Sequence, residues 1–154
     1  MTRRINTGVA AAAFCAIMVF CAGPASADSV YHSSHYNLTA VNEAPLRSGF
    51  VENIHANGPD IYAHEQYVLN GAAPNTTYDV GLMIFPGDTT CSSTPMSIST
   101  ATIQTNAAGN GVASHVFTPA DADGLRGMTV GGIWTISSGS TADYQTGCET
   151  IVLD

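Results

Sequence analysis

The stretch LNGAAPNTTYDV, residues 69–80, lies between two segments in which apolar and polar residues alternate. The segment before it, residues 61–69, places four residues on one side: Ile61, Ala63, Tyr67 and Leu69. The segment after it, residues 77–85, does the same with Tyr78, Val80, Leu82 and Ile84. A period of two is typical of a half-buried β-strand, and glycine and proline mark turns. The sequence therefore predicts two strands joined by a loop around Gly71 and Pro74.

Alternation and turn residues recur along the rest of the chain. Strands are expected at residues 31–41, 97–105, 112–117, 128–137 and 143–153, with a short one near 50–54. NAAGNG (106–111) predicts a compact hairpin turn between 97–105 and 112–117, in which Gly109 takes the left-handed conformation. A last hairpin is expected between 128–137 and 143–153. No helix of convincing length is indicated, so the pattern predicts an all-β sandwich of about seven strands.

The first residues have the layout of a secretory signal peptide. Arg3 and Arg4 precede an apolar stretch over residues 9–20, and the sequence ASA at 25–27 supplies the small residues that a signal peptidase accepts. The apolar stretch of about 12 residues is shorter than the roughly 20 that a membrane-spanning helix needs. We therefore expect residues 1–27 to be cleaved, leaving one domain over 28–154 without a transmembrane segment. The expected location is secreted or extracytoplasmic.

The chain is strongly acidic. Its 154 residues include 12 Asp and Glu but only 4 Lys and Arg, which gives a net charge of −8. Without residues 1–27, Arg47 and Arg126 would be the 2 remaining cations against the same 12 acids, a net charge of −10. Phosphate binding needs clustered Lys and Arg, so the composition argues against nucleic acid as a partner, and it disfavours anionic membranes. A protein, a glycan or a small molecule stays open as the partner.

Cys91 and Cys148 are the two cysteines that remain when residues 1–27 are removed. In an exported protein, a single pair of cysteines indicates one disulfide bond. A free reactive pair is the alternative interpretation.

Residues 69–80 resemble the corner between strands E and F of fibronectin type III and other immunoglobulin-like domains. There a strand ends in Leu, a Pro-containing loop crosses between the sheets, and Thr-x-Tyr-x-Val starts the next strand. The resemblance implies an immunoglobulin-like antiparallel β-sandwich with Greek-key connections. It also implies a tyrosine corner at Tyr78, whose ring would be buried and whose hydroxyl would bond the backbone upstream.

A second resemblance covers about half of residues 28–154. TTYDVG (76–81), the loop cysteine Cys91 and SISTATIQTNAAGNGVASHVF (97–117) are similar to neocarzinostatin-type apoproteins. These are small, acidic, secreted immunoglobulin-like carriers that hold a reactive enediyne in a cleft, so the resemblance implies small-molecule carriage. The family has two short-range disulfides, whereas Met83 stands about where one of those cysteines belongs. Cys91 would therefore have to reach Cys148.

The five histidines are the candidate metal ligands. On a strand, His32 and His35 point to opposite faces because side chains alternate, so this pair is not expected to hold one ion. His55, His64 and His115 are scattered along the sequence and would form a site only if they converged in space.

Two acidic residues resemble the start of a calcium loop, Asp121 and Asp123. Leu125 occupies the next ligand position and no glutamate closes the loop, so capping of a short turn is the preferred interpretation. We assign no metal or cofactor site from the sequence.

No catalytic motif is recognisable. Ser, His and acidic residues are present, but the Gly-x-Ser-x-Gly elbow of a serine hydrolase is missing. Trp134, with Val130 and Ile136 on its face, is interpreted as a core residue, with a sugar-stacking platform as the alternative. We therefore expect a secreted, non-catalytic immunoglobulin-like domain with a binding or envelope role. A small-molecule carrier is the first alternative, and a small hydrolase or metalloprotein that uses the scattered histidines is the second.

Overall fold

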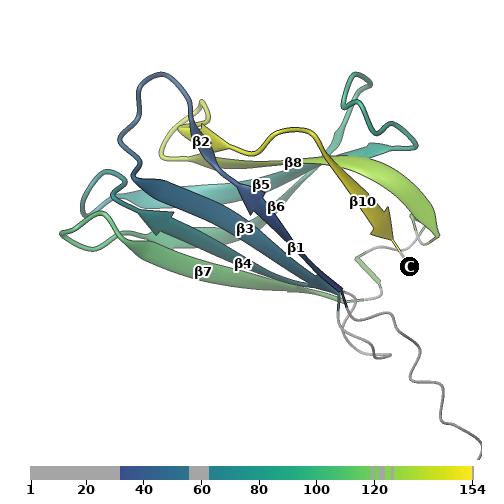
Figure 1. Cartoon of the computed structure of the whole chain (residues 1–154), viewed down its shortest axis with the longest axis horizontal. Coiled ribbons are helices and arrows are strands. Elements are labelled where there is room, and N and C mark those ends of the chain that lie inside the picture. Colours follow the sequence, from purple (N-terminus) through teal and green to yellow (C-terminus); the bar gives the residue numbers. More distant parts are fainter. Residues whose placement is uncertain (1–31, 56–62, 119, 122–123, 126, 154) are drawn as a thin grey trace, which may run out of the picture.

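The alternating segments form two antiparallel sheets that pack face to face. The computed structural model describes residues 32–55, 63–118, 120–121, 124–125 and 127–153. Figure 1 shows β1, β3, β4 and β7 side by side in one layer, with β8 and β10 in the other. The described residues contain strands and turns but no helix, so the predicted all-β sandwich is confirmed.

The first sheet has four strands in the order β1-β3-β4-β7. Their bounds are β1 (His32–Asn37), β3 (Ser48–His55), β4 (Ala63–Asn70) and β7 (Gly111–Phe117). All of the pairings in this sheet are antiparallel.

The second sheet has the order β2-β9-β8-β5-β6, and β10 also pairs with β8. Its longer strands are β5 (Thr77–Pro86), β6 (Met96–Gln104), β8 (Met128–Ser137) and β10 (Glu149–Leu153). Two strands of only 2 residues complete it, β2 (Thr39–Ala40) and β9 (Tyr144–Gln145). The last predicted hairpin is confirmed, because β9 and β10 both run antiparallel to β8.

The strand count differs from the prediction of about seven because two predicted strands are each divided between two partners. The predicted strand at residues 31–41 is interrupted at Leu38. Before this residue β1 pairs with β3, and after it β2 pairs with β9. Residues 143–153 split into β9 and β10. Ten strands therefore occupy the described part of the chain.

The prediction of a hairpin between residues 97–105 and 112–117 is wrong. β6 pairs with β5 and β7 pairs with β4, so the NAAGNG turn carries the chain from one sheet to the other. The reason is that the turn binds the loop at residues 71–76: the Ala72 amide donates to the Gly109 carbonyl at 3.0 Å, and the Gly71 amide donates to Asn110 Oδ1 at 3.1 Å. Gly109 does take the predicted left-handed conformation, with φ of 75°.

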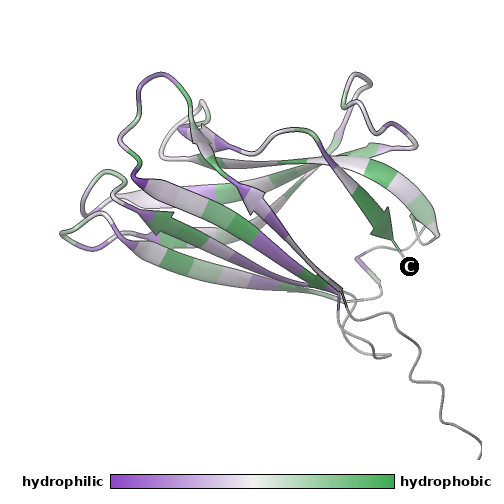
Figure 2. Ribbon diagram, in the orientation of Figure 1, coloured by the Kyte–Doolittle hydropathy of each residue, from purple (hydrophilic) through white to green (hydrophobic). Residues whose placement is uncertain are grey.

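The core lies between the two sheets. Figure 2 shows hydrophobic and hydrophilic residues alternating as bands along the strands. Four of the largest side chains are almost fully buried there: Trp134, Tyr67, Tyr78 and Tyr144. The Trp134 side chain is 0% exposed, which confirms its assignment to the core, and its ring stacks on Tyr36 at 4.9 Å between centroids.

A disulfide bond joins Cys91 to Cys148, as predicted, with 5.9 Å between the Cα atoms. Cys91 lies in the loop between β5 and β6, and Cys148 lies just before β10. The bond therefore fastens this loop to the C-terminal strand of the same sheet. None of the described residues belongs to a helix that could span a membrane.

Candidate functional site

Glu65 is a charged side chain in the interior of the sandwich. It lies on β4, where Ala63, Tyr67 and Leu69 also face inward because alternate residues of the strand share one side. The residue is 1% exposed. Charged residues are almost never fully buried unless they are paired, so the neighbours of this carboxyl group define the site.

Three donors hold the Glu65 carboxyl group. Asn53 Nδ2 on β3 donates to Oε1 at 2.8 Å, while the Tyr67 hydroxyl and Trp134 Nε1 donate to Oε2 at 2.5 Å and 2.8 Å. Hydrogen bonds to an ionised group are about twice as strong as neutral ones. Since Trp134 belongs to β8 of the other sheet, the carboxyl group connects the two sheets through the middle of the core.

Burial outweighs these donors in setting the proton affinity of the site. Desolvation raises the pKa of Glu65 from 4.5 to about 7, against the lowering effect of the bonds from Tyr67, Trp134 and Asn53. The pKa of Tyr67 is also raised, by its own burial and then by the adjacent carboxyl charge. No Lys or Arg in the described part of the chain forms an ion pair with Glu65. The Glu65 carboxyl group therefore titrates near neutral pH. It can exchange a proton or accept a hydrogen bond.

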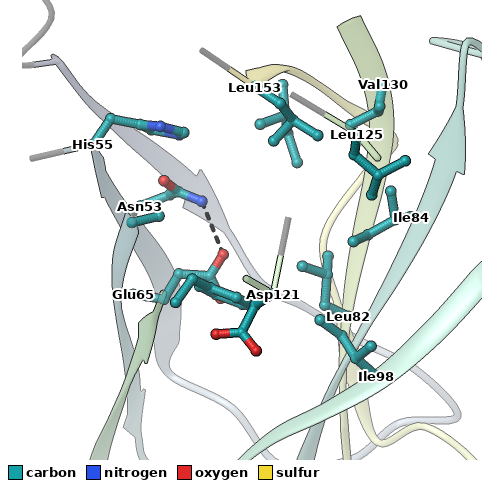
Figure 3. Close-up of a pocket in the computed structure, with 13 residues that line it drawn as sticks. Asn53, His55, Glu65, Leu82, Ile84, Ile98, Asp121, Leu125, Val130 and Leu153 are labelled. Atoms are coloured by element: carbon teal, nitrogen blue, oxygen red, sulfur yellow. Dashed lines mark hydrogen bonds between the residues drawn. The ribbon is translucent and has the colours of Figure 1, made fainter. Parts of the chain in front are cut away.

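A cavity of about 40 Å³ lies beside the carboxyl group. Figure 3 shows Asn53, His55 and Glu65 on one side of it, with apolar side chains of the second sheet opposite. The apolar lining includes Leu82, Ile84, Ile98, Val130, Ile151 and Leu153. The wall from the first sheet thus carries the polar residues Asn53, His55 and Glu65 beside Ala63 and Phe117, whereas the facing wall from the second sheet is apolar.

The Asn53 side chain leaves one polar atom unsatisfied. Asn53 is 4% exposed, and its Oδ1 has no hydrogen-bond partner in the described structure. Most buried polar atoms in proteins are bonded to protein or ordered water. The cavity lining therefore includes both an ionisable carboxyl group and a residue with an unused acceptor.

The histidines do not converge in the described structure. His35 bonds Glu52 on the outer face of the first sheet, Nδ1 to Oε2 at 2.9 Å, and the His115 ring packs on Phe117. No group of three or more His, Cys, Asp or Glu in the described residues is placed to hold a metal ion.

The other three histidines occupy different places. His55 is buried and lines the cavity, whereas His64 faces outward from β4. His32 opens β1, but its side chain lies outside the described residues.

Asp121 forms a local turn, as its capping interpretation expects. Its Oδ2 accepts bonds from the backbone amide and the hydroxyl of Thr118, at 2.7 and 2.8 Å, and these bonds lower its pKa. Asp121 also lines the cavity. Asp123 lies outside the described residues.

Tyr78 is 1% exposed and its hydroxyl accepts a bond from the Ala73 amide, five residues upstream, at 3.2 Å. The same hydroxyl lies 3.1 Å from the Tyr144 hydroxyl, which donates to the Pro45 carbonyl at 2.9 Å. These bonds fasten the loop before β5 to the core and to the segment before β3. Tyr78 lies away from the cavity lining, so its role here is structural.

Sequence reasoning missed Glu65 and Asn53. The signal was present, since the alternation that places Ala63, Tyr67 and Leu69 on one side of a strand places Glu65 there too. The same period places Asn53 between Val51 and His55 on the inner side of β3. A carboxylate on the apolar side of a strand is the pattern that would have identified the site.

Comparisons with known proteins give no further guidance. No family model matches the chain, and neither a curated protein nor a solved structure matches it.

Proposed function

We propose that this chain is an exported, non-catalytic immunoglobulin-like domain that acts by binding a protein at its surface. The disulfide bond supports export, because such bonds persist in oxidising compartments. A small-molecule carrier is the second candidate.

The strand pairing supports the immunoglobulin-like assignment. In an immunoglobulin domain, strands B and E are neighbours in one sheet and strands C and F are neighbours in the other. Here β4 pairs with β7 and β5 pairs with β8, and both connections, β4 to β5 and β7 to β8, cross between the sheets. This correspondence makes the loop before Tyr78 the equivalent of the connection from B to C, two crossings earlier than the E-to-F corner that the sequence resemblance implies.

The observation that carries the binding role is the exposed apolar surface of β7. Val112 is 59% exposed and Val116 is 46% exposed, and both lie on this edge strand. Phe50 and Val68 continue the surface, because Phe50 pairs with Val68 and Val68 pairs with Val112 in the register of the sheet. No described strand pairs with the outer edge of β7. Exposed apolar surface beside an open strand edge is typical of a docking site for an added strand.

The interior gives less support to a carrier. Pockets for drug-sized ligands commonly have volumes of about 300–1,000 Å³, whereas the cavity beside Glu65 has about 40 Å³. Trp134, Tyr67, Tyr78 and Tyr144 fill the space between the sheets.

Native mass spectrometry of the protein purified from its producing culture tests the proposal. We expect a chain that begins at residue 28 and carries a bound protein. The double variant Val112→Ser, Val116→Ser should reduce this association at least tenfold, whereas Val152→Ser, which alters an exposed valine of the other sheet, should not. A bound compound of a few hundred daltons that all variants retain would instead favour the carrier, and the absence of any bound species would contradict the proposal.

A further inference from the structure

The free edge of β7 lacks the features that keep an exposed strand from pairing with another chain. Natural edge strands are commonly short or bulged, or they carry proline or charged residues. β7 has 7 residues and contains no proline, Asp, Glu, Lys or Arg. Its register with β4 is continuous from Gly111 to Phe117, and Figure 1 shows it at the margin of its layer. The geometry of this edge therefore suits the addition of a further strand.

Two other long strands that end a sheet are more polar than β7. β1 lies at the opposite margin of the first sheet and has the sequence HSSHYN. β6 ends the second sheet and exposes Ser97, Ser99 and Thr102. Its pairing with β5 also contains a register shift between Val80 and Gly81. Of these three edge strands, β7 alone combines a regular register with two exposed valines.

The outward side chains of β7 are arranged symmetrically about its central residue. Ser114 is the middle residue of the strand, and Val112 and Val116 lie two positions to either side of it. All three are exposed, and side chains two positions apart share one face of a strand. An antiparallel pairing of two β7 strands, with a two-fold axis at Ser114, places each Val112 opposite Val116 of the other copy. The strand is thus complementary to itself over its whole length.

The charge distribution allows two copies to meet along this strand. The chain has a net charge of −8, so two copies repel each other in most orientations. Glu52 is the single acidic residue at the outward-facing positions of β1, β3, β4 and β7. Its carboxylate bonds His35 at 2.9 Å, and β4 separates it from β7. Pairing along β7 therefore brings no carboxylates together on this face.

We propose that the protein bound at β7 is a second copy of this chain, joined by antiparallel pairing of the two β7 strands about Ser114. The two first sheets then form one continuous sheet, with four strands from each copy. A two-fold interface, in which the same patch serves both partners, is the commonest arrangement of soluble homo-oligomers. A strand of another protein would have to match the spacing of Val112 and Val116 independently. This inference rests on the proposed surface-binding function and names its partner.

Sedimentation velocity of the purified protein, over about a hundredfold range of concentration, measures the association. We expect a monomer that converts to a dimer as the concentration rises. Added sodium chloride should strengthen the dimer, because it screens the repulsion between two acidic chains. The double variant Val112→Ser, Val116→Ser should raise the dissociation constant at least about tenfold, since it removes both opposed valine pairs. Val152→Ser, on β10, is the control and should dimerise as the wild type does.

Charges placed at Ser114 test the register of the pairing. Ser114→Glu would set two carboxylates opposite each other across the two-fold axis, and Ser114→Lys would set two ammonium groups there. Each variant alone should therefore associate at least about tenfold more weakly than the wild type. An equal mixture of the two should form a dimer that contains one chain of each kind, identified by its mass in native mass spectrometry. Ser97→Glu adds the same charge to the exposed face of β6 and should leave the wild-type association unchanged.

The second-copy proposal is overturned if the protein stays monomeric over the whole concentration range. It is also overturned if the valine variant dimerises as the wild type does, or if the mixture of Ser114→Glu and Ser114→Lys forms no mixed dimer. Native mass spectrometry of the secreted protein separates this failure from a failure of the surface-binding function. A bound protein of a different mass, lost in the valine variant, overturns the second copy but keeps the binding function. The absence of any bound protein contradicts both.

Discussion

Replacing Glu65 by glutamine is predicted to remove a pH dependence from the free energy of unfolding. Burial raises the pKa of this carboxyl group to about 7 from its ordinary 4.5. Between these two pH values the unfolded chain has lost the proton while the folded chain keeps it, so stability falls as the pH rises. The contribution is fully present below pH 4.5 and is lost as the pH rises through 7. One pH unit corresponds to about 1.36 kcal/mol, so the loss amounts to roughly 3 kcal/mol.

Glutamine keeps the size of the side chain and carries no charge. Its amide oxygen can accept from Tyr67 and Trp134, and its NH₂ can donate to Asn53 if that amide rotates so that Oδ1 faces it. The same rotation would let a protonated Glu65 donate to Asn53. We therefore expect the variant to resemble the acid form of the wild type at every pH.

Urea denaturation between pH 4.5 and pH 8, followed by Trp134 fluorescence, measures the effect. The free energies of unfolding of wild type and Glu65→Gln should change relative to each other by roughly 3 kcal/mol over this range, in favour of the variant at high pH. Both proteins contain the same five histidines, so the comparison addresses the change at Glu65. Glu52→Gln, on the outer face, should show no comparable change. A difference between wild type and Glu65→Gln that stays constant from pH 4.5 to pH 8 would refute the reasoning.

Three further predictions concern the frame around the site. Replacing both Cys91 and Cys148 by alanine should cost about 4 kcal/mol of unfolding free energy, because the bond closes a long loop; a change in denaturation midpoint equivalent to less than about 1 kcal/mol would contradict this. Gly109→Ala should cost more than about 3 kcal/mol, since its φ is 75° and a Cβ atom would lie 2.0 Å from a backbone oxygen. Gly139→Ala, with open space around it, is the control and should stay within about 1 kcal/mol. Tyr78→Phe should cost about 1–2 kcal/mol through loss of its buried hydrogen bonds, and thermal unfolding that matches the wild type would argue against that role.

The strands and the disulfide bond were predictable because their signals are local or compositional. Alternation is visible within a few residues, as at 77–85. If residues 1–27 are set aside as the expected signal peptide, two cysteines remain and leave one intramolecular pairing. The partners of 97–105 and 112–117 were not predictable in this way. Their turn has the residues of a hairpin, but its contacts with Ala72, more than 30 residues earlier in the chain, send the two strands to different sheets.

The candidate site was only partly predictable for a similar reason. The period of β4 already places Glu65 on the buried side. Two of its three donors are distant in the sequence: Asn53 lies 12 residues upstream and Trp134 lies 69 residues downstream. A sequence can therefore indicate a buried carboxylate, but the cavity and the donor set depend on how two sheets meet.

Burial of the Glu65 carboxyl group beside the cavity is tested most directly by its titration. NMR can follow the side-chain carboxyl ¹³C signal of Glu65 between pH 4.5 and pH 8. The signal is assigned by comparison with the spectrum of Glu65→Gln. The structure predicts a midpoint of about 7, accompanied by a shift of the Trp134 indole N–H signal at the same pH. A midpoint near 4.5, with an indole signal that does not respond to it, would contradict a buried carboxyl group at the centre of the sandwich.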